Sequence, residues 1–307
     1  MVNHLATAGE KLVLCVGHAI GYYMARRANP PCGAMTMAKP ALVTLLTDFG
    51  TADPYVAAMK GVILRACPAA TIVDISHDIP PQDVTAAALV LAQAAPYFPP
   101  GTLHVVVVDP TVGTDRRILA GRFAGQLFLF PDNGVITFVA ETMAMQVLAV
   151  VRAAESAGTA SVSMTFHGRD VFAPLAGQIL NGLDIARLGP PPSTYKTLDL
   201  PRPIEQEDRL IGRVIYADRF GNLISNVPAE AVRRRWLDTG QLIVSCAGRQ
   251  VGPIQATYAH AKEGEALALF NSMGLLEVAV NRGSAAQKLA AGVGSEVIVM
   301  EARHERL

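Results

Sequence analysis

HVVVVDPTVGTDRR, at residues 104–117, decides the fold of the first half of this chain. Its four consecutive valines, 105–108, predict a strand that is buried on both faces. The strand stops at the carboxylate of Asp109, Gly113 then permits a tight bend, and Arg116 follows. An acid at the carboxyl end of a buried strand, with a cation one loop away, is typical of a ligand site in an open α/β sheet.

Two more acids follow predicted strands in the same way. The run ALVTLLT, residues 41–47, leads into Asp48, and the run TIV, residues 71–73, leads into Asp74. Because ligand sites of open α/β sheets lie outside the carboxyl ends of the strands, the three acids are expected to converge on one crevice.

The chain divides into two predicted domains. Residues 37–190 alternate strands with helices, which indicates an N-terminal three-layer α/β domain with a mainly parallel sheet. Residues 191–208 are rich in proline and predict a linker, and residues 209–307 show short strands between turns, which predict an all-β, barrel-like C-terminal domain. The further predicted elements are a helix after Asp53–Pro54, helices at 84–95, 171–181 and 229–236, and strands at 102–108, 118–123 and 126–130.

Composition narrows the classes of function. The 307 residues are enough for two domains with large cores. Basic and acidic residues number 26 each, so the formal net charge is zero, which argues against a nucleic-acid partner. The absence of any run of 18 apolar residues argues against a membrane partner. The four cysteines lack CxxC spacing, so we expect reduced thiols in a cytoplasmic protein rather than disulfides or a zinc site.

Residues 1–36 differ in character and are predicted to be a leader that is disordered or is a non-native start. The apolar run LVLCVGHAIGYYM has only Lys11 as a cation before it and no clear cleavage site after it, which argues against a secretory signal. Met35 or Met37 would then be the natural start.

Each candidate site residue has a structural alternative. Asp48 could be a turn residue, or its carboxylate could accept two hydrogen bonds from the cis hydroxyls of a ribose. Asp109 and Arg116 could form a surface ion pair, and His167 could be an ordinary loop histidine. If these three side chains meet, they can hold and polarise one water molecule, with the acid accepting its proton.

The stretch DRFGN, residues 218–222, has the turn chemistry of a plain hairpin. Its functional interpretation uses Asp218 for an ammonium group, Asn222 for a polar head group and Phe220 as an apolar wall. The DFG at 48–50 does not indicate a kinase, because the glycine-rich phosphate loops and the VAIK lysine are missing.

Seven blocks of sequence follow one another in order between residue 42 and about residue 300. They are TDFGTADPYV (47–56), VDISHDIPPQDV (73–84), VVDPTVG (107–113), PDNG (131–134), FHGRD (166–170), DRFGNLISN (218–226) and NSMGLLEVAVNRGSA (271–285). Together they resemble the S-adenosyl-L-methionine hydroxide adenosyltransferase family, relatives of the fluorinases and chlorinases.

The resemblance implies the two domains described above and a homotrimer that binds substrate between the N-terminal domain of one subunit and the C-terminal domain of its neighbour. It implies hydrolysis of S-adenosylmethionine to adenosine and L-methionine by attack of water on the ribose C5′, with no cofactor and no metal. The implied catalytic set that positions and activates the water is Asp109, Arg116 and His167. The implied substrate contacts are Asp48, Asp53, Gly168, Asp218, Phe220, Asn222, Tyr258, Ser272, Glu277, Val280 and Asn281.

Three features favour water over a halide as the nucleophile. The anion of Asp109 would repel a desolvated halide. Gln82 stands where halogenases resemble one another in having tryptophan, and the segment after Asp109 leaves little room for their extra loop. A halogenase is therefore the less favoured alternative, and a non-catalytic sensor of adenosine or S-adenosylmethionine is the other. Thr111 departs from the glycine that is usual in this family's DPGVG.

Overall fold

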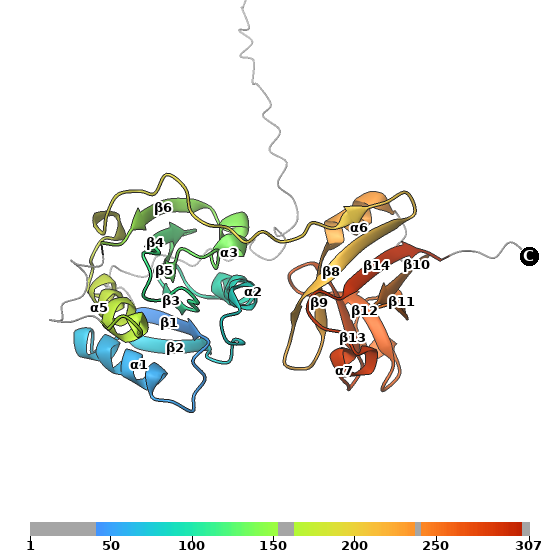
Figure 1. Ribbon diagram of the computed structural model, residues 1–307, viewed down its shortest axis with the longest axis horizontal. Helices are drawn as coiled ribbons and strands as arrows, with labels where there is room; N and C mark the ends of the chain where they lie inside the picture. The colour runs from blue at the N-terminus through green and yellow to red at the C-terminus, as the bar shows by residue number, and fades with distance from the viewer. Residues whose placement is uncertain (1–40, 153–162, 237–240, 303–307) are drawn as a thin grey trace, which may run out of the picture. The chain divides into compact units, whose positions relative to one another are not determined.

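The computed structural model describes residues 41–152, 163–236 and 241–302 (Figure 1). The predicted leader, 1–36, lies outside these residues, as do Cys15 and Cys32. The two cysteines within them, Cys67 and Cys246, are free thiols. No helix in the described ranges has the length and apolar character needed to cross a membrane.

The N-terminal domain contains a six-stranded sheet with the strand order β2-β1-β3-β5-β4-β6. Its strands are β1 (Leu42–Thr47), β2 (Thr71–Ser76), β3 (Leu103–Val107), β4 (Ile118–Phe123), β5 (Gln126–Pro131) and β6 (Met145–Val150). Its helices are α1 (Tyr55–Ala66), α2 (Val84–Ala94), α3 (Thr137–Thr142) and α5 (Ala173–Leu180), with short helical turns η1 (Ala95–Tyr97), η2 (Gly168–Phe172) and η3 (Ile185–Arg187). Strands β2, β1, β3 and β5 are parallel, and β4 runs antiparallel between β5 and β6. The predicted mainly parallel sheet is confirmed.

The four consecutive valines, 105–108, lie at the centre of this domain. All four are buried, and they alternate between two cores. Val105 and Val107 pack with side chains of α1 and α5, whereas Val106 and Val108 pack with those of α2 and α3. The helices therefore cover both faces of the sheet, as the continuous apolar run predicted.

Strand register brings two of the predicted acids to the same edge. Thr47, the last residue of β1, pairs with Val107, the last residue of β3. Asp48 and Asp109 follow these two ends, so their carboxylates emerge from neighbouring strands at the carboxyl edge of the sheet. This is the edge at which open α/β sheets bind ligands.

The C-terminal domain is a barrel of seven strands in the order β14-β10-β11-β12-β13-β9-β8. The barrel is closed because β14 also pairs with β8. A further short strand, β7, pairs with β8. The strands are β7 (Ile204–Glu205), β8 (Arg209–Ala217), β9 (Leu223–Pro228), β10 (Leu242–Cys246), β11 (Arg249–Gln255), β12 (Ala266–Phe270), β13 (Leu275–Val280) and β14 (Glu296–Glu301). Two short helices, α6 (Ala229–Arg235) and α7 (Ala285–Leu289), accompany them. The predicted barrel-like domain is confirmed.

Several elements were not predicted from the sequence. They are α3, β6, β11 and α7, and the helix expected at 171–181 begins earlier, with the π-helical turn η2. Helices α3 and α7 have six and five residues, too few to show a helical period. Helices this short gain most of their stability from tertiary packing, although α7 also has a local cap, because the Ser284 side chain accepts from the N–H of Gln287.

Candidate active site

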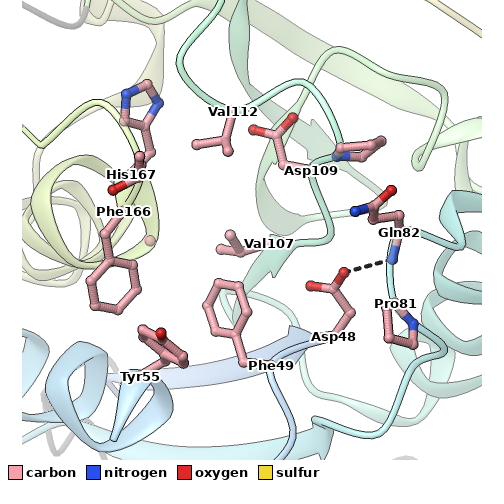
Figure 2. A pocket seen from close by; sticks show the side chains of 13 residues that line it. Asp48, Phe49, Tyr55, Pro81, Gln82, Val107, Asp109, Val112, Phe166 and His167 are labelled. Atoms are coloured by element: carbon pink, nitrogen blue, oxygen red, sulfur yellow. Dashed lines mark hydrogen bonds between the residues drawn. The ribbon is translucent and has the colours of Figure 1, made fainter. Parts of the chain in front are cut away.

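A cavity of about 360 Å³ opens where β1 and β3 end (Figure 2). Its lining comes from four separate segments that follow strands or precede helices of the N-terminal domain. The lining residues are Asp48, Phe49, Tyr55, Pro81, Gln82, Val107, Asp109, Pro110, Val112, Thr165, Phe166, His167 and Gly168. Four of the sequence-predicted site residues therefore share one cavity, namely Asp48, Asp109, His167 and Gly168.

Asp48 is oriented by the backbone of a neighbouring loop. Its Oδ2 accepts a hydrogen bond of 2.8 Å from the backbone N–H of Gln82 (Figure 2). Gln82 has a φ of 66°, in the left-handed region that non-glycine residues rarely occupy. Such strain persists only where surrounding structure imposes it, and it is concentrated at functional sites. Gln82 also lines the cavity, and the pattern PPQD gave no signal of its backbone conformation beyond that of a turn.

Asp109, Arg116 and His167 are in direct contact. The Arg116 Nε and Nη2 atoms each lie 2.5 Å from Asp109 Oδ2, and Nη2 lies 2.7 Å from His167 Nδ1. The side chains of Asp109 and Arg116 are only 3% and 5% exposed, so this is a buried ion pair rather than the surface pair considered above. Because a guanidinium can only donate, Nδ1 of His167 accepts, which leaves the proton of the neutral imidazole on Nε2.

The electrostatics of this group keep the imidazole neutral. Burial lowers the pKa of His167 below its usual value, and the adjacent Arg116 cation lowers it further. Asp109 and Asp170 act in the opposite direction. At neutral pH the group therefore consists of one anion, one cation and a neutral imidazole that still has an N–H to donate.

Glycines allow the two loops of the group to meet. Gly113 has a φ of 82°, and a Cβ on it would lie 2.5 Å from the carbonyl oxygen of Met164. Gly168 begins η2 directly after His167, and a Cβ there would press on the Met59 sulfur and on Phe166. Gly113 therefore lets the loop that carries Arg116 approach the segment before His167, and Gly168 lets η2 pack closely against α1.

An aromatic wall faces the acids across the cavity, as Figure 2 shows. The rings of Phe49, Tyr55 and Phe166 pack together with centroid separations of 5.2–6.0 Å. The sequence analysis missed these residues, although Phe49 and Phe166 each adjoin a predicted site residue. That adjacency is the signal that could have identified them.

Asp74 does not join this cavity, so the expectation that three acids converge is wrong. Asp74 pairs with Leu45 and thus lies inside β2 rather than at its end. Its carboxylate bonds to Lys60 of α1 at 2.6 Å and lies 3.1 Å from His77 Nε2. The sheet register, which the sequence did not reveal, decides which acids reach the edge.

A second group of predicted residues lines a cavity on the barrel. These residues are Asp218, Tyr258, Ser272 and Glu277. The Tyr258 hydroxyl donates a 2.7 Å hydrogen bond to Glu277 Oε1. Glu277 is 4% exposed, and burial raises its pKa, as does the nearby carboxylate of Asp218. Two carboxylates in one cavity suit a cationic ligand group.

The remaining predicted residues lie outside the two cavity linings. Asn222 is buried and donates through Nδ2 to Asp218 at 2.9 Å, so it supports a lining residue. Phe220 is 77% exposed, and Asp53 is also exposed. Val280 is buried, and Asn281 donates to the carbonyl of Ala261 at 2.8 Å. In the described part of the chain, no group of three or more His, Cys, Asp or Glu could hold a metal ion.

Comparison with known proteins matches both domains to one family. Residues 43–189 match the family model described as SAM hydroxide adenosyltransferase N-terminal domain, and residues 212–298 match the corresponding C-terminal domain. The chain is 38% identical to a protein of Thermus thermophilus named (R)-S-adenosyl-L-methionine hydrolase, over 83% of this chain and 98% of that one. A protein of Methanocaldococcus jannaschii with the same name is 36% identical, over 77% and 87% of the two chains.

More distant relatives and a solved structure agree with this placement. A protein of an Actinoplanes species named fluorinase is 26% identical over 85% of this chain and 98% of its own length. A crystal structure of an uncharacterised conserved protein from Thermotoga maritima aligns with a TM-score of 0.78 and 35% identity. That alignment covers 84% of this chain and all of the other.

Proposed function

Because this chain belongs to the S-adenosyl-L-methionine hydroxide adenosyltransferase family, we propose that it hydrolyses S-adenosyl-L-methionine to adenosine and L-methionine. The observation that carries the proposal is the contact of Asp109, Arg116 and His167 beside a cavity that also contains Asp48. Relatives at 36–38% identity are named hydrolases of this substrate.

The nucleophile is a water molecule held by the buried group. Asp109 accepts one hydrogen bond from the water and finally its proton, while the His167 Nε2–H donates to the water oxygen. Arg116 fixes both partners, because its guanidinium bonds to each of them. Holding the water in line with C5′ of the ribose removes much of the entropic cost of the reaction.

The substrate itself supplies the leaving group. Attack of the water oxygen on C5′ breaks the C5′–S bond, and the sulfonium leaves as the neutral thioether of methionine. A thioether needs no proton on leaving, so the chain does not require an acid, a metal or a cofactor for that step. The positive charge is lost as the bond breaks, and a site that excludes bulk water therefore favours the transition state over the charged ground state.

In this proposal Asp48 binds the ribose, and the barrel binds the methionine end. One carboxylate can accept hydrogen bonds from both ribose hydroxyls, and the Gln82 N–H fixes its orientation. On the barrel, Asp218 lines a cavity in which it would pair with an ammonium group, and Glu277, expected on the adenine side, lines the same cavity. Ser272 provides a polar contact in the same lining.

Water rather than a halide is the proposed nucleophile. A fluoride or chloride beside the buried carboxylate of Asp109 would meet like charge where screening is weak. Relatives named fluorinase are 26% identical to this chain, whereas those named hydrolases reach 38%.

The active form is proposed to be a homotrimer in the cytoplasm, with substrate bound between the N-terminal domain of one subunit and the barrel of the next. Exposed apolar side chains at the cavity linings support an assembled site. Tyr55 and Val112 are 45% and 38% exposed on the N-terminal domain, and Tyr258 is 42% exposed on the barrel.

Incubation of the purified protein with S-adenosylmethionine in water labelled with heavy oxygen tests the reaction. Adenosine that carries the label, in an amount unchanged by chloride, supports direct hydrolysis at C5′. Tight binding without any product would indicate a non-catalytic sensor. A halogenated nucleoside would show that the carboxylate of Asp109 does not exclude halide.

A further inference from the structure

Thr111 holds the oxygen of Asp109 that Arg116 leaves free. Arg116 directs both of its bonds to Oδ2 of that carboxylate. Oδ1 accepts a hydrogen bond of 3.0 Å from the Thr111 hydroxyl and one of 3.2 Å from the Thr111 backbone N–H. The two carboxylate oxygens are therefore fixed from opposite sides by two residues of one loop.

The loop backbone determines where the threonine hydroxyl points. The carbonyl of Thr111 accepts from the backbone N–H of Thr114 at 3.2 Å and from its hydroxyl at 2.8 Å. The N–H of Val112 bonds to the carbonyl of Asp109 at 3.2 Å. Thr111 is not among the residues that line the cavity, whereas Asp109 is, so the contact of the Thr111 hydroxyl with Asp109 is its direct link to the lining.

We propose that the Thr111 hydroxyl is a positioning group for the hydrolytic water: it fixes the second oxygen of Asp109 and so the orientation of this carboxylate. The proposal rests on the proposed hydrolase function and adds a residue to its machinery. A glycine here would retain the backbone N–H but would lose the hydroxyl. In this chain the carboxylate of Asp109 therefore accepts one more hydrogen bond than a DPGVG loop could donate to it.

The physical basis is that hydrogen bonds to a carboxylate stabilise its charged form. Other charges also act on Asp109. Arg116, on the same loop, stabilises the anion, and His167, from the neighbouring segment, is held neutral. Asp48, which follows β1 and lines the same cavity, is a second anion. The threonine hydroxyl is a neutral donor. It therefore stabilises the Asp109 anion without changing the net charge of the site that binds the sulfonium.

The test compares Thr111→Val, which keeps the β-branched shape without the hydroxyl, with Thr111→Ser, which keeps the hydroxyl. The pH profile of kcat is measured for both variants and for the native enzyme. We expect the acid limb of Thr111→Val to move to higher pH by about one unit, with KM nearly unchanged. Thr111→Ser should keep the native profile. Because neither substitution touches His167, its contribution is common to all three enzymes.

Urea denaturation provides a second readout that does not depend on turnover. At neutral pH, Thr111→Val should lower the folding equilibrium constant about tenfold in the native background. It should change that constant much less when Asp109→Ala has already removed the acceptor. If Thr111→Val has the native pH profile, if valine and serine act alike, or if the two substitutions are additive in urea, the proposal is overturned. A native protein without turnover would instead refute the proposed function, and the urea cycle would still decide the role of Thr111.

Discussion

At the scale of single residues, the two acids of the cavity have different partners and therefore different roles. Asp48 accepts a neutral backbone donor, whereas Asp109 is in contact with a guanidinium and, through it, with an imidazole. A carboxylate held by a neutral donor is suited to bind hydroxyl groups. A carboxylate held in a buried charged group is suited to act on a water molecule.

Asp109→Ala should reduce turnover much more than binding. Loss of the acceptor for the water proton should lower kcat about 100-fold or more, because general-base groups contribute about 10²–10⁴-fold. The dissociation constant of S-adenosylmethionine, measured by calorimetry, should change little. Equal turnover in the variant and the native enzyme would exclude Asp109 from activation of the water.

Asp48→Ala should weaken binding of adenosine and of the substrate. Loss of charge-assisted hydrogen bonds to the ribose hydroxyls should raise the dissociation constant by about tenfold or more. A nucleoside that lacks both the 2′ and 3′ hydroxyls should bind the native enzyme and the variant alike. An unchanged dissociation constant for adenosine would refute the ribose assignment.

At the scale of elements, a buried histidine links the strands of the N-terminal sheet. His104 of β3 bonds to the Thr44 hydroxyl of β1 at 2.7 Å and to Gln126 Oε1 of β5 at 3.3 Å. Gln126 in turn donates to the carbonyls of Ala95 and Phe98. Burial lowers the pKa of His104 from 6.5 to about 4, so the fold holds the neutral imidazole.

This histidine should make the stability of the sheet depend on pH. Because the folded-state pKa lies below the unfolded value, its contribution is complete above pH 6.5 and is lost as the pH falls toward 4. The full effect is about 3 kcal/mol. Urea denaturation between about pH 7 and about pH 5 should show a smaller loss in His104→Gln, which cannot titrate. Identical pH slopes for the two proteins would contradict this assignment.

The loop that carries Arg116 depends on Gly113. Gly113→Ala should both strain the backbone and press on the carbonyl of Met164, moving the His167 segment away from Arg116. Gly182→Ala is a matched control, because Gly182 also has a positive φ but a Cβ there meets open space. Gly182→Ala should lose about 1–2 kcal/mol of stability from strain alone, Gly113→Ala should lose more, and only Gly113→Ala should also lose activity in the adenosine assay. A fully active Gly113→Ala enzyme would show that the loop tolerates the shift.

At the scale of the whole molecule, the sequence predicted the layers of the N-terminal domain and the position of the site better than it predicted the individual short helices and strands. The apolar run at 105–108 and the acids after it located the sheet edge, because burial on two faces and a strand end are both visible in a sequence. Asp74 was misplaced because sheet register is a tertiary property. The sequence singled out Gln82 only as the counterpart of a halogenase tryptophan, and its backbone conformation was not predicted because a positive φ at a non-glycine residue has no sequence signature.

The proposed homotrimer should be detectable by its molecular mass. Light scattering of the eluting protein should give three times the 32.5 kDa of one chain. Dilution that dissociates the trimer should abolish turnover, because neither the acids of the N-terminal domain nor the carboxylates of the barrel would then form a complete site. A fully active monomer would refute the shared site.

The closure of the barrel by β14 also determines when this domain can form during synthesis. Strand β6, the last of the N-terminal sheet, ends at Val150, so that sheet can form while translation continues. Strands β8 and β10 both pair with β14, which ends at Glu301. Until those final residues leave the ribosome, both strands expose open edges that could pair with other nascent chains. If translation ended before residue 296, the released chain would therefore contain a complete N-terminal sheet and an aggregation-prone C-terminal half.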